Sequence, residues 1–419
     1  MSGLPDDWNP AMTDRTPSDA APPRRGALSR FTILDATRVR AGPTAVRFFA
    51  DLGARVIKLE IPPGAPGGDD MIGGRDHNRA DYENLHRNKE SLTLNMKEPE
   101  GLAILHELVK SADVFIENYR PDVKYRLGIG PDDLRKINPR LVYASISGFG
   151  QDGPYANWPG FDSIAQGMGG LMSVTGKPED GPMRVGIPIA DLCSGHFCAQ
   201  AIMAALLERE VSGEGQWVQT SLLESQIAML DFQAAQWLID RKVPKSTGNE
   251  HPLTVPTGVF QTRDGYINLA AIGNTMFKRL CVALEVPELI DEPGLGSDPQ
   301  RVQNRARVNA AVGAAFLKRS TGEWTEILLK AGVPCGPIYT VDRMFEDPQV
   351  KHLGIARTLQ HPELGDIEVV GLPMNFSRYP RQDGPLKAAP AQGDQTGQIL
   401  GELGYSAERI AELRSRCVV

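Results

Sequence analysis

The sequence predicts an α/β protein built on a parallel β-sheet. Short apolar runs of strand length alternate with longer segments whose apolar residues recur at helical spacing, a pattern typical of βαβ units. A first complete unit lies between Phe31 and Glu60. The chain has 419 residues, which is enough for two or three domains with sizeable cores.

The first unit consists of a strand, a helix and a second strand. Residues 31–35 and 55–60 are strand-like apolar runs, and residues 44–52 carry apolar side chains on one helical face. Because parallel strands need a crossover connection, these segments predict two parallel strands joined by a helix. The later segments predicted as strands are 113–117, 141–147, 185–190 and 217–221. The later segments predicted as helices are 98–111, 191–210 and 222–239.

The composition changes after residue 240 and indicates a second, smaller domain. Residues 241–256 are rich in Lys, Pro, Gly and Asn, as linkers are. A hairpin pattern follows, in which residues 258–262 and 266–270 flank an Asp-Gly turn. A strand at 367–371 and a helix from residue 395 to 404 or beyond close the chain. We therefore expect a disordered tail at 1–30, the N-terminal part of a large α/β domain at 31–240, a linker at 241–256, a small α+β domain at 257–340, and a return linker with the C-terminal part of the large domain at 341–419.

Charge and cysteine usage exclude several classes of protein. The formal charge of −7 and the pI near 5.6 give no general basic field, which argues against a nucleic-acid partner. The five cysteines are scattered without a Cys-x-x-Cys pair, so neither a disulfide scaffold nor a metal site is indicated. No apolar stretch approaches the roughly 20 residues that span a bilayer, and the N-terminus lacks the apolar region of a signal peptide. We expect a cytoplasmic protein with no membrane partner.

Asp191 is the most informative carboxylate of the chain. It ends the apolar run 184–190 and opens a helical segment, so it is expected at a strand-to-helix junction. Backbone N–H groups and the helix dipole would stabilise its anion there. Local sequence leaves two interpretations open: Asp191 caps its helix, or it is a nucleophile.

Two familiar site patterns are incomplete. The loop at 40–44 has one glycine and a proline in place of Gly-x-Gly-x-x-Gly, which argues against NAD even though Glu60 ends the second strand. Ser194 and His196 lie near Asp191, but no Gly-x-Ser-x-Gly elbow surrounds the serine. Neither a dehydrogenase nor a hydrolase is therefore favoured.

Basic residues gather next to predicted strand ends, where α/β sheets bind their ligands. They suit a phosphorylated ligand, or they form a solvated charged face. Asn118 and Tyr119 follow a predicted strand and offer an amide and an aromatic surface to an adenine. The basic residues are Lys58, Arg87, Lys89, Arg120, Lys124 and Arg126.

Taken together, the segments resemble the family III CoA-transferases. The strongest matches are LDATRVRAGP at 34–43, LGARVIKLE at 52–60, ADVFIENYRP at 112–121, GFDSIAQ at 160–166 and ADLCSG at 190–195. Further matches, in family order, are 88–95, 138–144, 148–154 and 332–337. The resemblance implies a Rossmann-like large domain made from both chain ends, a small domain between them, and a homodimer of two interlocked, ring-like chains.

The resemblance also implies a reaction and a site. Asp191 stands at the position of the family's nucleophile, which takes CoA from an acyl-CoA, possibly succinyl-CoA, to a free carboxylic acid. The intermediates are an acyl-aspartyl anhydride and an aspartyl-CoA thioester, and neither a metal nor a permanently bound cofactor is required. The family's CoA contacts fall on Val39, Arg40, Ala41, Leu94, Asn95, Met96, Lys97, Asn118, Tyr119, Arg126, Phe161 and Asp162.

Three differences from related enzymes bear on the expected substrate and on the alternative functions. Formyl-CoA transferase has glutamine where Arg40 stands, and its glycine-rich gating loop has no counterpart at 247–256, so a dicarboxylate such as succinate is more attractive than oxalate. The related α-methylacyl-CoA racemases use a histidine where this chain has Phe161, which cannot transfer a proton. A racemase-like enzyme and a non-catalytic acyl-CoA binder remain the alternatives.

Overall fold

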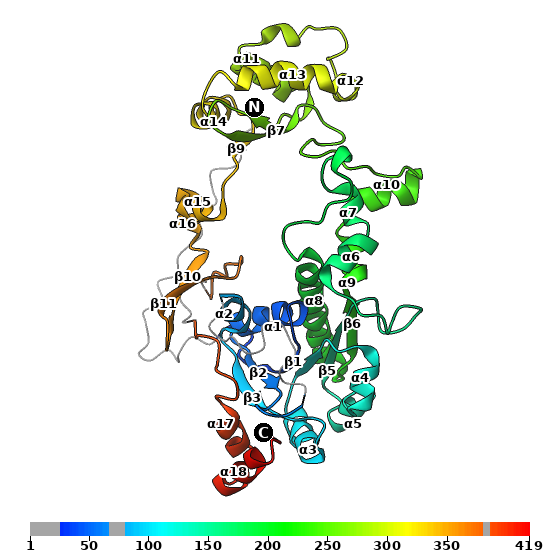
Figure 1. Cartoon of the computed structure of the whole chain (residues 1–419), viewed down its shortest axis with the longest axis vertical. Coiled ribbons are helices and arrows are strands. Elements are labelled where there is room, and N and C mark those ends of the chain that lie inside the picture. Colours follow the sequence, from blue (N-terminus) through cyan, green and yellow to red (C-terminus); the bar gives the residue numbers. More distant parts are fainter. Residues whose placement is uncertain (1–25, 67–79, 380–385) are drawn as a thin grey trace.

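The computed structural model describes residues 26–66, 80–379 and 386–419. A six-stranded parallel sheet with strand order β3-β2-β1-β4-β5-β6 lies in the lower part of the molecule as drawn in Figure 1. This is the order of a doubly wound, Rossmann-like sheet, and it reverses between β1 and β4. The α/β prediction is thereby confirmed. The strands are β1 (Thr32–Ala36), β2 (Arg55–Glu60), β3 (Glu90–Thr93), β4 (Val114–Glu117), β5 (Val142–Ser147) and β6 (Trp217–Ser221).

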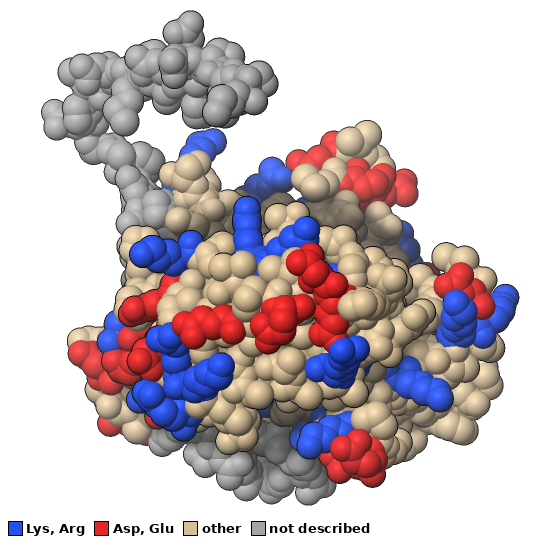
Figure 2. Space-filling view, turned by 90° about the horizontal axis from the view of Figure 1, so that it is seen from above, with Lys and Arg blue, Asp and Glu red and all other residues tan. Residues whose placement is uncertain are grey.

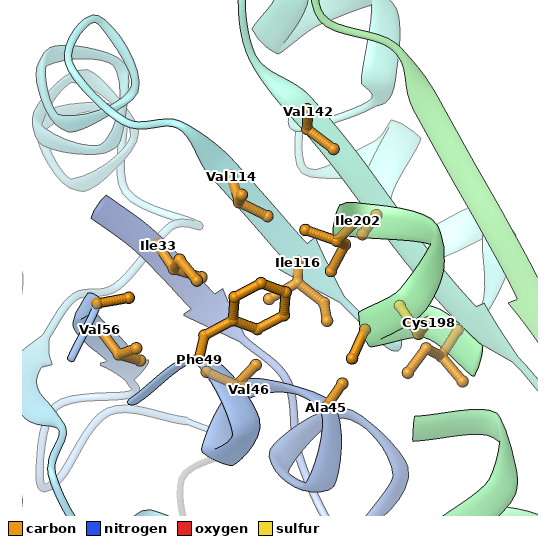
Figure 3. Packing of buried hydrophobic residues seen from close by; sticks show 14 of the residues in the cluster. Ile33, Ala45, Val46, Phe49, Val56, Val114, Ile116, Val142, Cys198 and Ile202 are labelled. Carbon is orange, nitrogen blue, oxygen red and sulfur yellow. The ribbon is translucent and has the colours of Figure 1, made fainter. Parts of the chain in front are cut away.

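Helices cover both faces of this sheet, which explains why β4 and β5 are buried along their whole length. One face packs against α1 (Ala41–Asp51) and α8 (Ile189–Ser212). Figure 3 shows Phe49 of α1 among Ile33, Val56 and Ile116 of the strands, with Ile202 of α8 beside them. The other face packs against α3 (Pro99–Val109), α5 (Pro131–Ile137), α17 (Thr396–Glu402) and α18 (Ala407–Ser415). Both ends of the chain therefore contribute to one core.

A second core forms around a three-stranded antiparallel sheet, β7-β8-β9, at the far end of the molecule (Figure 1). The hairpin prediction is confirmed, because β7 and β8 pair from Thr257–Ala270 to Gln261–Tyr266. The strands are β7 (Thr257–Gln261), β8 (Tyr266–Ala270) and β9 (Cys335–Pro337). The helices are α11 (Gly273–Ala283), α12 (Asp298–Gln303), α13 (Arg305–Phe316) and α14 (Thr321–Lys330), with a short 3-10 turn at Pro287–Leu289.

Two connections join these cores, and the ribbon encloses an open ring (Figure 1). One side of the ring carries α6 (Asp162–Met168), α7 (Leu171–Val174), α9 (Leu222–Ala228) and α10 (Phe232–Asp240). The other carries α15 (Val341–Glu346), α16 (Pro348–Leu353), β10 (Ala356–His361) and β11 (Gly365–Val370). Two short helices, α2 (Ala80–His86) and α4 (Pro121–Arg126), and a 3-10 turn at Pro178–Asp180 complete the elements. The residue ranges given above for the domains stay a prediction.

Two predicted elements are wrong. Residues 185–190 form no strand, because Gly186 and Pro188 interrupt the run and α8 already begins at Ile189. The predicted helix 222–239 is two helices, since the chain turns at Asp231 with φ of 47°. The edge strand β3 was not predicted.

Leu28 packs in the core and its N–H donates to the Leu52 carbonyl, which places residues 26–30 with the folded chain rather than with the predicted tail. The rest of that prediction, residues 1–25, lies outside the described residues.

Among the described helices, α8 alone is long and apolar enough to cross a membrane by length and composition. Its packing against α1 and the sheet accounts for this apolar character, because the core helix of a globular protein has the same composition. On the face shown in Figure 2, acidic and basic side chains are interspersed. Within the described ranges, no group of three or more His, Cys, Asp and Glu residues could hold a metal ion.

Candidate active site

A cavity of about 1030 Å³ opens where the strand order reverses. Doubly wound sheets bind ligands at this place, because the loops after the two diverging strands separate there. The loop after β1 supplies Val39 and Arg40, and the loop after β4 supplies Asn118 and Tyr119. The start of α8 adds Asp191 to the same wall.

The loop after β1 is held in a strained conformation. Val39 has φ of 65°, which a β-branched residue rarely adopts. Asn118 fixes the neighbouring peptide, since its Oδ1 accepts from the Arg38 N–H at 2.9 Å and its Nδ2 donates to the Arg38 carbonyl at 2.8 Å. Asp35 accepts from the Thr37 N–H at 3.0 Å on the other side of the loop. The side chain of Asn118 therefore positions Val39 and Arg40, instead of being a free amide for an adenine.

Asp191 lies in the first turn of α8, and Asp162 caps that helix from outside. The Asp162 Oδ1 accepts from the N–H groups of Ala190 at 2.8 Å and Asp191 at 3.4 Å. Its Oδ2 accepts from Gln166 Nε2 at 2.7 Å, and Gln166 Oε1 accepts from the Val185 N–H at 2.9 Å. This network holds the irregular segment before α8. Asp191 is thus not the capping residue, and within the described chain its carboxylate has no hydrogen-bond or ion-pair partner.

Burial and the neighbouring Asp162 raise the pKa of Asp191 to about 6, while Arg40 acts in the opposite direction. The position at the start of a helix predicts a stabilised anion, but the net effect of the surroundings is the reverse. A carboxyl group with this pKa is still mostly ionised at neutral pH. It is also more basic than an ordinary aspartate, and Asp191 is one of the residues that line the cavity.

Arg40 lines the same cavity, and its positive charge lowers the pKa of Asp191. Its Nη2 contacts both carboxylate oxygens of Asp81 in α2, at 3.0 and 2.9 Å. The Arg40 side chain is 27% exposed and the Asp81 side chain 54% exposed. The pair is therefore in contact with water.

The structure brings the predicted site residues together. All the CoA contacts inferred from the resemblance except Asp162 line this cavity, and Asp162 stands behind it as the cap of α8. Other lining residues were not predicted. Arg38 lies in the matched segment 34–43 and Ser147 ends a predicted strand, but neither was singled out as a contact. The remainder are apolar or belong to a loop without a recognisable pattern, and include Leu102, Ala156, Trp158 and Leu222. The run of aromatic residues in 149–158 was the available sign, since Phe149, Tyr155 and Trp158 form one ring cluster.

The predicted basic cluster is wrong for four of its members, which are buried and paired with acids. Lys58 pairs with Glu60, Arg87 with Asp51, Lys89 with Asp35, and Lys124 with Glu117. These side chains neutralise carboxylates in and around the sheet instead of facing a ligand. Arg120 and Arg126 do line the cavity.

The thiols and His196 show no arrangement for nucleophilic catalysis. Burial raises the pKa of Cys193 to about 11 and that of Cys198 to about 12, so both stay protonated at neutral pH. His196 is not among the residues that line the cavity.

The fold and this cavity define an α/β enzyme whose site presents a free carboxylate to a large ligand. The chain belongs to CoA-transferase family III, whose model matches residues 28–396. It is a CoA-transferase. Its relatives include the succinyl-CoA:glutarate CoA-transferase of Homo sapiens, 38% identical over 94% of this chain and 90% of that protein.

A bacterial relative and a solved structure agree with this assignment. The succinate–glutarate CoA-transferase of Agrobacterium fabrum is 37% identical over 91% of this chain and 97% of that protein. The crystal structure of a CaiB/BaiF family protein from Brucella suis superposes with a TM-score of 0.78. It shares 32% identity and covers 91% of this chain and 100% of its own.

Proposed function

We propose that the enzyme transfers CoA from succinyl-CoA to a dicarboxylic acid, with Asp191 as the nucleophile. The observation that carries this proposal is the unpaired Asp191 carboxylate in the wall of the cavity. The relatives named above support the choice of substrates.

The proposed reaction proceeds through two kinds of acyl-enzyme. An Asp191 oxygen attacks the thioester carbonyl of succinyl-CoA, the C–S bond breaks, and a mixed anhydride and CoA thiolate form. The thiolate attacks the Asp191 carbonyl carbon of the anhydride, which releases succinate and leaves an aspartyl-CoA thioester. The acceptor carboxylate then reverses these steps: it displaces the thiolate to form a new anhydride, and the thiolate attacks the acceptor acyl carbon and frees Asp191.

The cavity residues support this chemistry in distinct ways. The predicted contacts from Val39 to Ala41, from Leu94 to Lys97, and Tyr119 and Arg126 line the cavity, which supports binding of CoA there. Asp162 holds the start of α8 and thereby the Asp191 backbone. Burial of Asp191 limits access of water to the anhydride and the thioester, both of which water would hydrolyse. Phe161 lines the cavity and has no proton to transfer, so the geometry does not favour racemisation.

We also propose that two copies interlock through the open ring. Helix α10 has no buried residue, although Trp237, Leu238 and Ile239 are large and apolar. On the other side of the ring Ile338 and Val341 are exposed as well, at 54% and 73%. Apolar surface of this extent marks an interface, and a second copy threaded through the ring would cover both sides. A cytoplasmic location belongs to the same proposal, in keeping with cysteines that are all free.

The experiment that tests the reaction is a transfer assay with mass spectrometry. Succinyl-CoA and a panel of carboxylic acids are incubated with the enzyme, and new CoA esters are identified. Brief incubation with succinyl-CoA followed by borohydride should trap the Asp191 thioester by reducing it to the alcohol, and peptide mapping would locate it. Undiminished transfer by Asp191→Ala would overturn the role of the nucleophile. Exchange of the α-proton of an acyl-CoA with solvent deuterium would support racemisation instead.

A further inference from the structure

The ion pair between Arg40 and Asp81 differs from the buried acid–base pairs around the sheet. Arg87 and Asp51 form two parallel bonds, Nε to Oδ1 at 3.0 Å and Nη2 to Oδ2 at 2.6 Å, and their side chains are 0% and 4% exposed. That pair is buried and geometrically complete. Arg40 and Asp81 are 27% and 54% exposed, and a pair this accessible to water adds little to stability.

Arg40 also keeps unused hydrogen-bond capacity. Only its Nη2 contacts Asp81, and among the described residues Nη1 and Nε have no partner. A guanidinium can bind a carboxylate through two parallel N–H donors, a geometry that the contact with Asp81 does not use. A better-placed carboxylate would therefore make stronger bonds to Arg40 than Asp81 does.

The position of Arg40 indicates which carboxylate that is. Arg40 and Asp191 line the same cavity, and the guanidinium is close enough to lower the pKa of Asp191. A dicarboxylic acid that reacts at Asp191 through one carboxylate must place its second, unreactive carboxylate elsewhere in the cavity. Arg40 is a cation in the wall of the same cavity. Its present partner, Asp81, offers it a carboxylate, which is the group that the distal end of a dicarboxylic acid would also offer.

We propose that Asp81 is an internal substitute for the distal carboxylate of the substrate: it occupies Arg40 in the empty site, and a dicarboxylic acid displaces it. This inference rests on the proposed function and adds the residues that set selectivity. Arg40 makes the enzyme prefer dicarboxylic over monocarboxylic acids, and competition from Asp81 lowers the affinity for the preferred class. Asp81 acts through Arg40 and is a positioning residue.

The test compares glutarate with pentanoate, which has the same chain length and lacks the distal carboxylate. Initial rates are measured with succinyl-CoA as donor for the wild-type full-length enzyme, Asp81→Asn, Arg40→Gln and Arg40→Lys. Asp132→Asn is the matched control, because it also neutralises an exposed aspartate in the first turn of a helix, away from the cavity. Glutarate binding to each protein is measured separately by calorimetry.

Asp81→Asn should lower the KM and the Kd for glutarate about three- to tenfold, with little change in kcat and no change for pentanoate. Arg40→Gln should raise the KM for glutarate about tenfold or more and abolish the preference over pentanoate, and Arg40→Lys should restore part of it. When Asp81→Asn is combined with Arg40→Gln, it should not change the KM for glutarate further, because the guanidinium with which Asp81 pairs is no longer present.

Several results would overturn the inference. One is an Asp81→Asn enzyme whose glutarate KM and Kd equal those of Asp132→Asn or exceed those of wild type. Others are a preference for glutarate that survives Arg40→Gln, and failure of glutarate to bind any of the proteins. If the wild-type enzyme transferred no CoA to any acid, the proposed function would fail, while the glutarate Kd values of the same variants would still decide the role of Asp81.

Discussion

Asp191→Asn should abolish CoA transfer and yet stabilise the folded protein at neutral and alkaline pH. The pKa of Asp191 rises from the ordinary 3.8 to about 6, because burial and Asp162 disfavour the anion. The native state therefore binds this proton more tightly than the unfolded state does. Between pH 3.8 and about 6 ionisation becomes progressively more destabilising, and the effect is nearly constant above about pH 7.

The size of the effect follows from the shift. A change from 3.8 to about 6 corresponds to at most about 3 kcal/mol at pH 8, and residual contact with water reduces it to an expected 1–2 kcal/mol, roughly. Near pH 4.5 the difference should be about a third of that at pH 8, because the native carboxyl is then protonated and this pH lies only slightly above the ordinary value of 3.8. Asparagine keeps the shape of the side chain and carries no charge.

The assay is thermal unfolding of wild type, Asp191→Asn and the surface control Asp132→Asn at pH 8 and pH 4.5. The reasoning predicts a higher Tm for Asp191→Asn at pH 8, a gain that shrinks at pH 4.5, and no such pattern for the control. A variant less stable than wild type at pH 8, or a gain independent of pH, would refute it. Residual transfer near the wild-type rate would separately refute the assignment of Asp191 as nucleophile.

Three further predictions concern the same site and the assembly. Wild-type kcat/KM for succinyl-CoA should fall tenfold per pH unit below about pH 6, as the raised pKa of Asp191 requires, and a pH–rate profile with an acid limb near 4 would contradict this. Asn118→Ala removes the two hydrogen bonds to the Arg38 backbone and so lets the strained backbone at Val39 relax. We expect kcat/KM to fall about tenfold or more. Asn118→Asp loses only the donor and should be less affected in a parallel assay. Light scattering after size exclusion should give twice the mass of one chain for wild type and a lower mass for a Leu238→Glu variant, whereas a monomeric wild type would remove the proposed interlocked dimer.

The sequence predicts those parts of the structure that follow a regular spacing of apolar residues or a family motif. Residues 31–60 predicted a βαβ unit, and the structure has β1, α1 and β2 there, with the helix starting at Ala41 instead of residue 44. The family motifs predicted most of the cavity wall, since their residues follow the strands that diverge at the switch point.

What sequence could not supply is the pairing of side chains. Lys89 and Lys124 were expected to face a ligand because they lie near strand ends, but Lys89 pairs with buried Asp35 of β1, and Lys124 of α4 pairs with buried Glu117 of β4. Which side chains meet depends on how strands and helices pack in three dimensions, and periodicity contains no information about that packing. Arg40 and Asp81 are 41 residues apart in the sequence, so their pairing could not be predicted for the same reason.

Asp162 connects the fold to the chemistry through two opposing effects. Its carboxylate accepts hydrogen bonds from the N–H groups at the start of α8, which orders the backbone that carries Asp191. Its negative charge raises the pKa of the Asp191 side chain. With a pKa near 6, the proposed nucleophile Asp191 is more basic than an ordinary aspartate and is still about 90% ionised at pH 7. This suits a group that must be both deprotonated and reactive. Asp162→Asn separates the two roles, because the amide oxygen can still accept the Ala190 N–H while the charge is lost. We expect this variant to move the acid limb of kcat/KM to lower pH with the fold intact, and Asp162→Ala to lose thermal stability as well. An unchanged acid limb in Asp162→Asn would show that burial alone sets the pKa of Asp191.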